Sequence, residues 1–332
     1  MMQRLLGVLI IVTSLATGWF MMEFDNFRGQ ALKLSGEGIT YQLEPGTGVA
    51  TLALDLQQRG ILDKPLLLRI LARWNEQAHL IKAGEYWIPA GTTPEELLAL
   101  LVSGKVTTHA LTLVEGWTFR QMMAAVNASD ALTHLLEGLS DEAIMQRLGH
   151  AGEHPEGRFL SDTYHFPRGM TDLQFLQRAY DAMTRKLAQK WEQREEGLPL
   201  MTPYEAQILA SIVEKETGLA SERPTIAGVF IRRLRLGMKL QTDPTIIYGL
   251  GDAYDGNIRR SDLKKDTPYN TYLHKGLTPT PICMPGEAAL DAVLHPAESK
   301  SLYFVAKGDG SHYFSSTLKE HNRAVRKYQL KK

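Results

Sequence analysis

The sequence predicts an α+β fold in which a membrane-spanning helix precedes two compact units. Three observations lead to this prediction: a long apolar segment opens the chain, short strand and helix patterns alternate after it, and the second half holds long amphipathic helices. The chain has 332 residues, 44% of them hydrophobic, which is enough for about two domains with separate cores. The expected parts are an anchor (1–22), a linker (23–39), a small α+β module (40–105) and a larger α+β domain (106–332).

The apolar segment has the length and the flanking charges of a membrane anchor. Residues from Leu5 to Met22 are uncharged, Arg4 precedes them, and Glu23 and Asp25 follow. At about 1.5 Å per residue such a helix spans the hydrocarbon core, and the flanking charges favour a cytoplasmic N-terminus. A cleaved signal peptide, for which "TSLATG" would be a weak cleavage site, and a buried core helix are the alternatives. With a retained anchor in the cytoplasmic membrane, the rest of the chain is periplasmic.

Composition and motifs exclude several classes of function. The formal net charge of +0 argues against a nucleic-acid binder, and Cys283, as the only cysteine, allows neither an intrachain disulfide nor a Cys-based metal site. Nucleotide-binding glycine loops and H-E-x-x-H are missing from the sequence. His150 and His154 lie four apart, but Gly and Pro interrupt the helix that would align them. We therefore expect no metal and no cofactor.

The order of elements follows from turn and cap residues. In the module we expect strands at 40–43 and 85–88 and three helices. The first helix covers 49–56, the second begins after Asp63 as its N-cap, and the third begins at "TTPEE". Beyond it we expect a strand, a helix capped by Thr118, an aromatic loop at 153–171 and a long helix at 173–195. The next helix begins near Thr202, and "SLYFVAKGDGSHYFSST" is typical of a hairpin.

Two glutamates in "ILASIVEKETGLASER" lie on opposite faces of the helix that begins near Thr202. At about 100° per residue, Glu216 falls within the apolar arc of Leu209, Ile212 and Val213. Glu214 falls on the far side with Ser211 and Lys215, where we expect it to meet water. Gly218 is expected to cap the helix C-terminus.

A carboxyl group on an apolar face is expected to have a raised pKa, because burial disfavours its charged form. Glu216 also lies in the last turn, where the negative end of the helix dipole disfavours ionisation further. These conditions produce a general acid. The alternative is a salt bridge from Glu216 to Arg223, Arg232 or Arg233.

Two polar segments follow this helix. Gln241, Thr242 and Asp243 precede a proline turn, and Tyr269, Asn270, Thr271 and Tyr272 combine amide and hydroxyl groups with aromatic faces. Such a mixture suits the recognition of sugars. The alternative is an ordinary loop with buried, satisfied tyrosines.

Several blocks, taken in order, resemble the YceG-like family of endolytic murein transglycosylases. They are "VEGWTFRQM", "EGRFLSDTYHF", "ASIVEKETGLASER", "LQTDPTIIYGLG", "PYNTYLHKGLTPTPI", "HPAESKSLYFVAKGDGSHYFS" and "HNRAVRKY". The resemblance covers the chain from about residue 40, with Gly218 and Ser161 as departures where relatives often have Ala and Pro. It implies that residues 40–105 form a LysM-like module and that residues 106–332 form the catalytic domain.

The resemblance also implies an activity. The second glutamate of E-K-E-T, here Glu216, would act as acid and then base in cleaving the MurNAc–GlcNAc β-1,4 bond of nascent glycan strands, leaving 1,6-anhydro ends. By position in the motifs, the substrate-binding candidates are Gln241, Thr242, Asp243, Tyr269, Asn270 and Tyr272. The expected partners are peptidoglycan strands and, through residues 5–22, the cytoplasmic membrane. The resemblance is also compatible with cell-wall synthases as partners.

Two other functions stay open at this point. In a hydrolytic muramidase, Asp243 would act as the base beside Glu216 and activate water. In a scaffold without enzymatic activity, the LysM-like module would bind glycan at the membrane.

Overall fold

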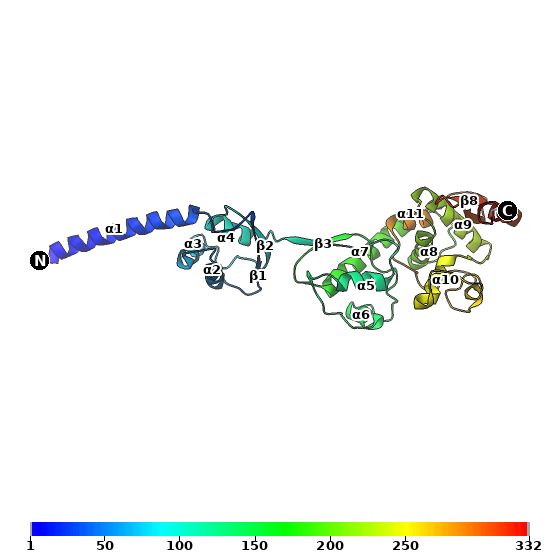
Figure 1. Cartoon of the computed structure of the whole chain (residues 1–332), viewed down its shortest axis with the longest axis horizontal. Coiled ribbons are helices and arrows are strands. Elements are labelled where there is room, and N and C mark those ends of the chain that lie inside the picture. Colours follow the sequence, from blue (N-terminus) through cyan, green and yellow to red (C-terminus); the bar gives the residue numbers. More distant parts are fainter. Residues whose placement is uncertain (1, 331–332) are drawn as a thin grey trace. The chain divides into compact units, whose positions relative to one another are not determined.

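The computed structural model describes residues 2–330 and divides into two compact units (Figure 1). The first contains the chain up to His109 together with His165–Gly169, and the second contains Ala110–Tyr164 and the chain from Met170 onward. Helices dominate both units, and the strands described form only two-stranded sheets. The mixed helix and sheet content agrees with the predicted α+β class.

The first unit places an antiparallel pair of strands against short helices. Its elements are α1 (Met2–Gly29), β1 (Gly38–Leu43), α2 (Val49–Gln58), α3 (Pro65–Trp74), β2 (Gly84–Pro89) and α4 (Pro94–Ser103). Tyr41 of β1 lies opposite Tyr86 of β2, and both rings are buried. Helix α4 begins at the expected cap, where Thr93 forms a capping box with Glu96. The N-cap of α3 is Lys64 and not Asp63, whose carboxylate pairs with Lys33. The LysM-like assignment of this unit stays a prediction.

Helix α1 is long and apolar enough to cross a membrane, and it continues past the apolar segment. Its best 18-residue window has a mean hydropathy of 2.1 and is fully exposed. Residues 23–29, expected in a linker, are helical because Phe24 and Phe27 pack into the core of the first unit. Phe24 is 5% exposed and Phe27 is 6% exposed.

Glu85 ties two later segments of the chain to the first unit. Its carboxylate binds Arg168 and the ring of His109. The chain leaves the first unit after His109, returns to it at His165 and leaves it again after Gly169. Burial raises the pKa of Glu85, but the hydrogen bonds from Arg168 and His109 outweigh burial and lower it overall. The strands β3 (Thr108–Thr112) and β5 (Thr163–Pro167) at these passages pair with each other.

The second unit is built around α8, which is buried on all sides. Every residue of α8 from Ala206 to Val213 is buried. The neighbours of α8 are α7, α9, α10 and α11. The elements of the unit are α5 (Phe119–Asn127), β4 (Leu132–Thr133), α6 (Asp141–Arg147), β6 (Met170–Thr171), α7 (Asp172–Glu192), α8 (Pro203–Glu216), α9 (Arg223–Arg235), α10 (Asp243–Leu250), α11 (Glu287–Leu294), β7 (Tyr303–Ala306), β8 (His312–Ser315) and α12 (Leu318–Tyr328), with 3₁₀ turns at Ala220–Glu222, Gly251–Ala253 and Asp262–Lys264.

The segment 153–171, expected to be a loop, contains β5 and β6 and holds a tight contact to α8. Gly157 has φ +79°, and its carbonyl oxygen accepts a hydrogen bond of 2.6 Å from the buried Gln207 side chain. A Cβ atom on Gly157 would lie 2.5 Å from Cβ of Pro281. The backbone here therefore requires glycine for two reasons, its positive φ and the lack of space.

We expect Gly157→Ala to lower the melting temperature much more than Gly152→Ala does. Gly152 has φ +85° but open space around it, so its substitution costs only the backbone strain of about 1–2 kcal/mol. Gly157→Ala adds overpacking of about 1–3 kcal/mol. Thermal unfolding of the full chain in detergent measures both variants, and equal shifts would contradict the close approach to Pro281.

Candidate active site

Glu216 is the last residue of α8. The helix stops there because Thr217 has an extended backbone with φ −148°, and its hydroxyl accepts a hydrogen bond from the Leu219 N–H. Gly218, expected as the cap, does not adopt a positive φ. An extended, buried Thr217 therefore ends α8 with the Glu216 side chain at its C-terminus.

The Glu216 carboxyl group is partly buried and has one hydrogen-bond partner. The Thr242 hydroxyl donates to Oε1 of Glu216, while Oε2 makes no hydrogen bond to any residue between 2 and 330. Thr242 itself is 2% exposed, and its backbone N–H donates to the Thr271 hydroxyl over 3.1 Å. One oxygen of the carboxyl is thus fixed, and the other is left to carry a proton.

The surroundings raise the pKa of Glu216 to about 7. Burial is the main cause, and the negative charge of Asp243 adds to it. The Thr242 hydrogen bond, the electrostatic effect of His312 and the positive charge of Arg233 lower the pKa of Glu216 but do not compensate for burial. Glu216 is therefore about half protonated at neutral pH, as a general acid requires.

None of the three arginines considered as salt-bridge partners pairs with Glu216. Arg223 pairs with Glu214 at 2.9 Å. Arg232 donates to backbone carbonyls, and so does Arg233, whose guanidinium binds the carbonyl oxygens of Leu302 and Leu240 at 2.7 Å each. Arg233 therefore acts on Glu216 only through its charge.

The hairpin β7–β8 brings the imidazole of His312 close enough to Glu216 to affect the pKa of that carboxyl. The ring of His312 is held by Glu222, whose carboxylate lies 2.7 Å from Nδ1 and accepts the His312 backbone N–H over 2.9 Å. The sequence analysis assigned His312 only to a hairpin and did not select it. The one signal in the sequence that could have identified His312 is its position in the block "GDGSHYFS", which resembles the YceG-like family.

Glu214 does not meet water as expected. Its side chain is 6% exposed, pairs with Arg223 and accepts the Gly286 backbone N–H over 3.0 Å. Ser211, expected on the same wet face, is fully buried and accepts the Ile282 backbone N–H over 2.9 Å. The prediction for both residues was wrong because the segment around Ile282 covers the face of α8 that the helical projection left open. Burial raises the pKa of Glu214, whereas the Gly286 N–H and Arg223 lower it.

The two polar segments predicted to bind sugar lie beside each other next to Glu216. The Gln241 N–H donates to the Thr271 carbonyl over 3.2 Å, and the Tyr272 hydroxyl donates to Asp243 over 2.6 Å. Gln241 has φ +49°, a strained conformation for a residue with a side chain. Asp243 is exposed. Burial of Tyr272, together with the hydrogen bond from Tyr272 to Asp243, raises the pKa of Tyr272.

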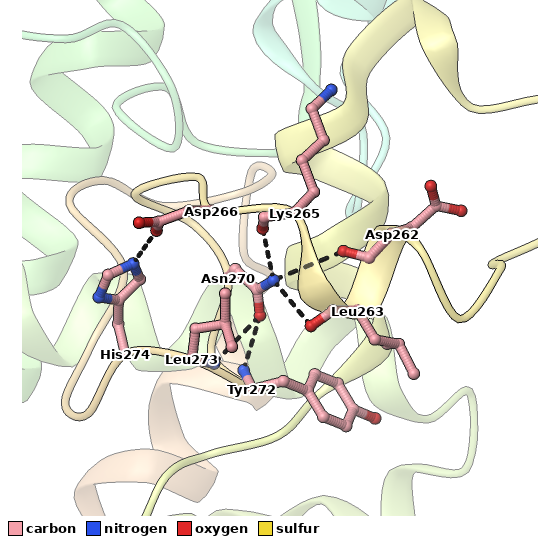
Figure 2. Close-up of polar contacts among 8 residues, drawn as sticks. All are labelled: Asp262, Leu263, Lys265, Asp266, Asn270, Tyr272, Leu273 and His274. Carbon is pink, nitrogen blue, oxygen red and sulfur yellow. Dashed lines mark hydrogen bonds and ion pairs between the residues drawn. The ribbon is translucent and has the colours of Figure 1, made fainter.

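Asn270 holds the loop that carries Tyr272 (Figure 2). Its side-chain N–H groups donate to the carbonyls of Asp262, Leu263 and Lys265, and its Oδ1 accepts the N–H groups of Tyr272 and Leu273. Asn270 is 1% exposed, so its amide is occupied by the loop and is not open to a ligand. It positions Tyr272 instead.

Tyr269 lines a cavity of about 960 Å³. Its hydroxyl lies 2.8 Å from the Thr280 hydroxyl, and its ring packs edge-on against Tyr248. The cavity is lined by α5, α6, α10 and residues 154 and 156. Two further lining residues, Lys215 and Pro244, are the chain neighbours of Glu216 and Asp243.

The cavity contains a second carboxyl group with a raised pKa, which the sequence analysis did not select. Burial raises the pKa of Glu156 to about 7. Both of its oxygens are occupied, one by the Phe119 N–H at 2.9 Å and the other by the Tyr248 hydroxyl at 3.1 Å, and the residue is 3% exposed. Glu156 is therefore less available than Glu216 as a proton donor. Its position in the block "EGRFLSDTYHF" was the one signal in the sequence.

Metal chemistry has no evident location in the part of the chain that is described. Between residues 2 and 330, His, Cys, Asp and Glu side chains do not gather in any group of three or more that could hold an ion. Cys283 is buried and free.

We expect Glu216→Gln to stabilise the protein at alkaline pH and to have little effect at acidic pH. The folded state holds the Glu216 proton up to a pKa of about 7, whereas the unfolded chain loses it near 4.5, so the carboxyl destabilises the fold increasingly between these values. The difference corresponds to at most about 3 kcal/mol. Melting temperatures of wild type and variant at pH 5 and pH 8 test this, and a constant difference would contradict the raised pKa.

Comparisons with known proteins identify the family of the chain. The YceG-like family model matches residues 41–327. An endolytic murein transglycosylase of Bacillus subtilis (strain 168) is 30% identical over 308 residues, covering 87% of this chain and 84% of that protein. One of Streptococcus pneumoniae (serotype 2, strain D39) is 26% identical over 322 residues, covering 86% of this chain but 58% of that protein.

A solved structure shows the same fold. The crystal structure of a YceG-like protein from Listeria monocytogenes has a TM-score of 0.54 and 26% sequence identity, and the match covers 87% of this chain and 99% of that one. Since the family model matches most of the chain, and the B. subtilis relative is 30% identical over most of both proteins, the chain belongs to the YceG-like family.

Proposed function

We propose that this protein is a lytic transglycosylase that cuts within peptidoglycan strands at the MurNAc–GlcNAc β-1,4 bond. One observation carries the proposal: the Glu216 carboxyl, with a pKa of about 7, stands at the end of α8 with one oxygen held by Thr242 and the other free. The activity in the names of the relatives from B. subtilis and S. pneumoniae supports the same conclusion.

The reaction needs only one carboxyl group from the protein. The proton on Oε2 of Glu216 passes to the glycosidic oxygen as the bond from that oxygen to C1 of MurNAc breaks. The 6-hydroxyl of the same MurNAc then bonds to C1, and its proton goes to the Glu216 carboxylate. The product has a 1,6-anhydro end, Glu216 is protonated again, and no water is consumed. Most glycoside hydrolases need a second carboxylate because their nucleophile is not part of the sugar.

The neighbours of Glu216 fit supporting roles in this reaction. The Asp243 carboxylate, oriented by the Tyr272 hydroxyl, is exposed and close enough to raise the pKa of Glu216, so its negative charge would stabilise an oxocarbenium-like state. Gln241 and Tyr269 present polar groups from the same two segments. The cavity beside Lys215 and Pro244 offers room for parts of the strand away from the scissile bond.

We infer that the protein is anchored in the cytoplasmic membrane by residues 5–22, with its N-terminus in the cytoplasm and the catalytic unit in the periplasm. The length and hydropathy of α1 support a single span, and Arg4 and Glu23 at its two ends support this orientation. Nascent glycan strands lie close to that membrane, so cell-wall synthases fit as partners.

The exposed Asp243 also favours a second candidate, a hydrolytic muramidase in which Asp243 activates water. The two reactions leave different ends, because hydrolysis gives a reducible sugar and transglycosylation gives an anhydro sugar. A scaffold without enzymatic activity would give no new ends at all.

We expect the full chain in detergent to release fragments with 1,6-anhydro ends from purified glycan strands. Glu216→Gln is expected to lower the rate at least about 10³-fold, since it removes the only acid and base of the reaction. Mass spectrometry of the fragments, with and without borohydride reduction, measures both results. Reducible ends would contradict this proposal and show that the protein is a hydrolase. If wild type releases no fragments, the scaffold without enzymatic activity is the correct function.

Glu214→Gln is the matched control on the same helix turn. We expect it to keep most of the activity, and to lower the melting temperature because Arg223 loses the charge of its partner. The rate is compared per folded protein, at a temperature well below both transitions. An equal loss of activity in both variants would show that Glu216 has no special role.

The rate should fall as pH rises through about 7, because the acid must be protonated at the start of each turnover. Thr242→Val removes a hydrogen bond that stabilises the ionised Glu216, so we expect the alkaline limb of kcat/KM to move up by about one pH value. Glu156→Gln is the control for the other carboxyl with a pKa of about 7 and should leave the limb in place. A limb that moves with Glu156→Gln and not with Thr242→Val would assign the acid to Glu156.

A further inference from the structure

The membrane helix does not end in a flexible joint, because its last turns are part of the first unit. Phe24 and Phe27 lie in the core together with residues of α3 and α4. Glu23 pairs with Lys64, the residue before α3, and the ring of Phe24 lies 6.1 Å from that of Trp74, the last residue of α3. The first unit is thus fixed to α1 just beyond the apolar segment.

These two contacts set the direction of α3. Glu23 and Phe24 are neighbours on α1 and differ in height by only about 1.5 Å, whereas α3, with ten residues, is about 15 Å long. Because both ends of α3 meet α1 at nearly the same height, α3 runs across α1 and not along it. Figure 1 shows α3 near the end of α1 within this unit. A helix that crosses a membrane-spanning helix at this height lies along the membrane surface.

The outer side of α3 has the composition of a membrane-surface helix. Leu67, Leu68 and Leu71 are buried in the core. The opposite side, which we call the α3 face, consists of Leu66, Arg69, Arg73 and Trp74. Leu66 is 61% exposed and Trp74 is 67% exposed, although both are large and apolar.

The two arginines of the α3 face are free to bind another partner. Between residues 2 and 330, neither Arg69 nor Arg73 forms a salt bridge, whereas Lys33 and Lys64 close by are paired with Asp63 and Glu23. Exposed apolar side chains between unpaired arginines are the pattern that binds headgroups and the upper part of the acyl chains. Tryptophan also prefers this depth.

We propose that the α3 face binds the surface of an anionic phospholipid bilayer, beside the point where α1 enters it. The inference rests on the proposed anchoring by α1 but does not depend on the reaction at Glu216. It gives the first unit two attachments to the membrane, one through α1 and one through the α3 face. The second attachment depends on the charge of the lipid headgroups, with an effect of roughly fivefold per arginine on the docking equilibrium.

The test uses the full chain in nanodiscs with an environment-sensitive fluorophore on an introduced cysteine. Leu66→Cys, and as a second site Arg73→Cys, report on the α3 face. Leu54→Cys, which is 52% exposed on α2, is the matched control in the same unit, and Trp19→Cys, 63% exposed, reports whether α1 lies in the bilayer. Cys283 is fully buried, so one label per chain confirms that each variant is folded.

We expect the label at 66 to shift to shorter wavelength in nanodiscs that contain phosphatidylglycerol and to be quenched by lipids brominated on the acyl chain. The label at 54 should show neither effect. Combining Leu66→Cys with Arg69→Glu and Arg73→Glu, or using phosphatidylcholine alone, should reduce the quenched fraction.

Three results would overturn the proposal, each in a distinct way. If position 19 is quenched but positions 66 and 73 behave like 54, α1 is an anchor and the α3 face does not bind lipid. If position 19 is not quenched, the anchoring itself fails. If position 66 is quenched equally in neutral and anionic nanodiscs, with or without the arginines, headgroup charge has no role.

Discussion

The hydrogen bond from Thr242 to Glu216 is the interaction on which the candidate site depends. It joins the end of α8 to the residue before α10, so it fixes the reactive carboxyl relative to Asp243. Thr242 can hold this position because its backbone N–H and carbonyl are themselves bonded, to Thr271 and Thr245. The strained φ of Gln241 fits this view, since backbone strain persists only where the surroundings fix it.

The pKa of Glu216 results from a competition in which burial prevails over the Thr242 hydrogen bond and the electrostatic effects of His312 and Arg233. Arg233 would make a strong ion pair if it reached the carboxyl, and the pKa would then fall well below 7. Instead, backbone carbonyls of Leu302, Lys239 and Leu240 occupy its guanidinium, and burial lowers the pKa of Arg233 as well. The ring of His312 is also bound within the protein, by the carboxylate of Glu222. The site therefore keeps the Arg233 guanidinium close to Glu216 without an ion pair between the two side chains.

The sequence predicted the apolar setting of Glu216 better than that of the residues around it. The helical projection placed Glu216 on an apolar face because Leu209, Ile212 and Val213 lie within the same arc, and the structure buries all three. The projection failed for Glu214 and Ser211 because it treats a helix as having one covered face, whereas the Ile282 segment covers a second one. Such a contact joins residues about 70 positions apart in the chain, and no local pattern encodes it.

The polar segments show the same limit from the other side. Amide and hydroxyl groups in 241–243 and 269–272 indicated a polar site. The residue types alone could not show which of these side chains would form hydrogen bonds within the protein and so be unavailable to a ligand. Asn270 is occupied by five backbone groups, and Tyr269 is turned toward Thr280. Glu156 was missed because one glutamate in a Gly/Pro-rich loop has no periodicity from which burial could be inferred.

The prediction of a linker at residues 23–39 was wrong for residues 23–29, which belong to α1. Polar residues such as Glu23 and Asp25 hide the helical spacing of Phe24 and Phe27, which mark the side that packs on the first unit. Burying a phenylalanine side chain contributes about 1.5–3 kcal/mol, so two of them favour the docked helix by a factor of roughly 100 or more. A flexible linker would let the first unit move freely above the bilayer. With α1 docked, the height of this unit is set by the point at which the apolar segment ends, at Met22.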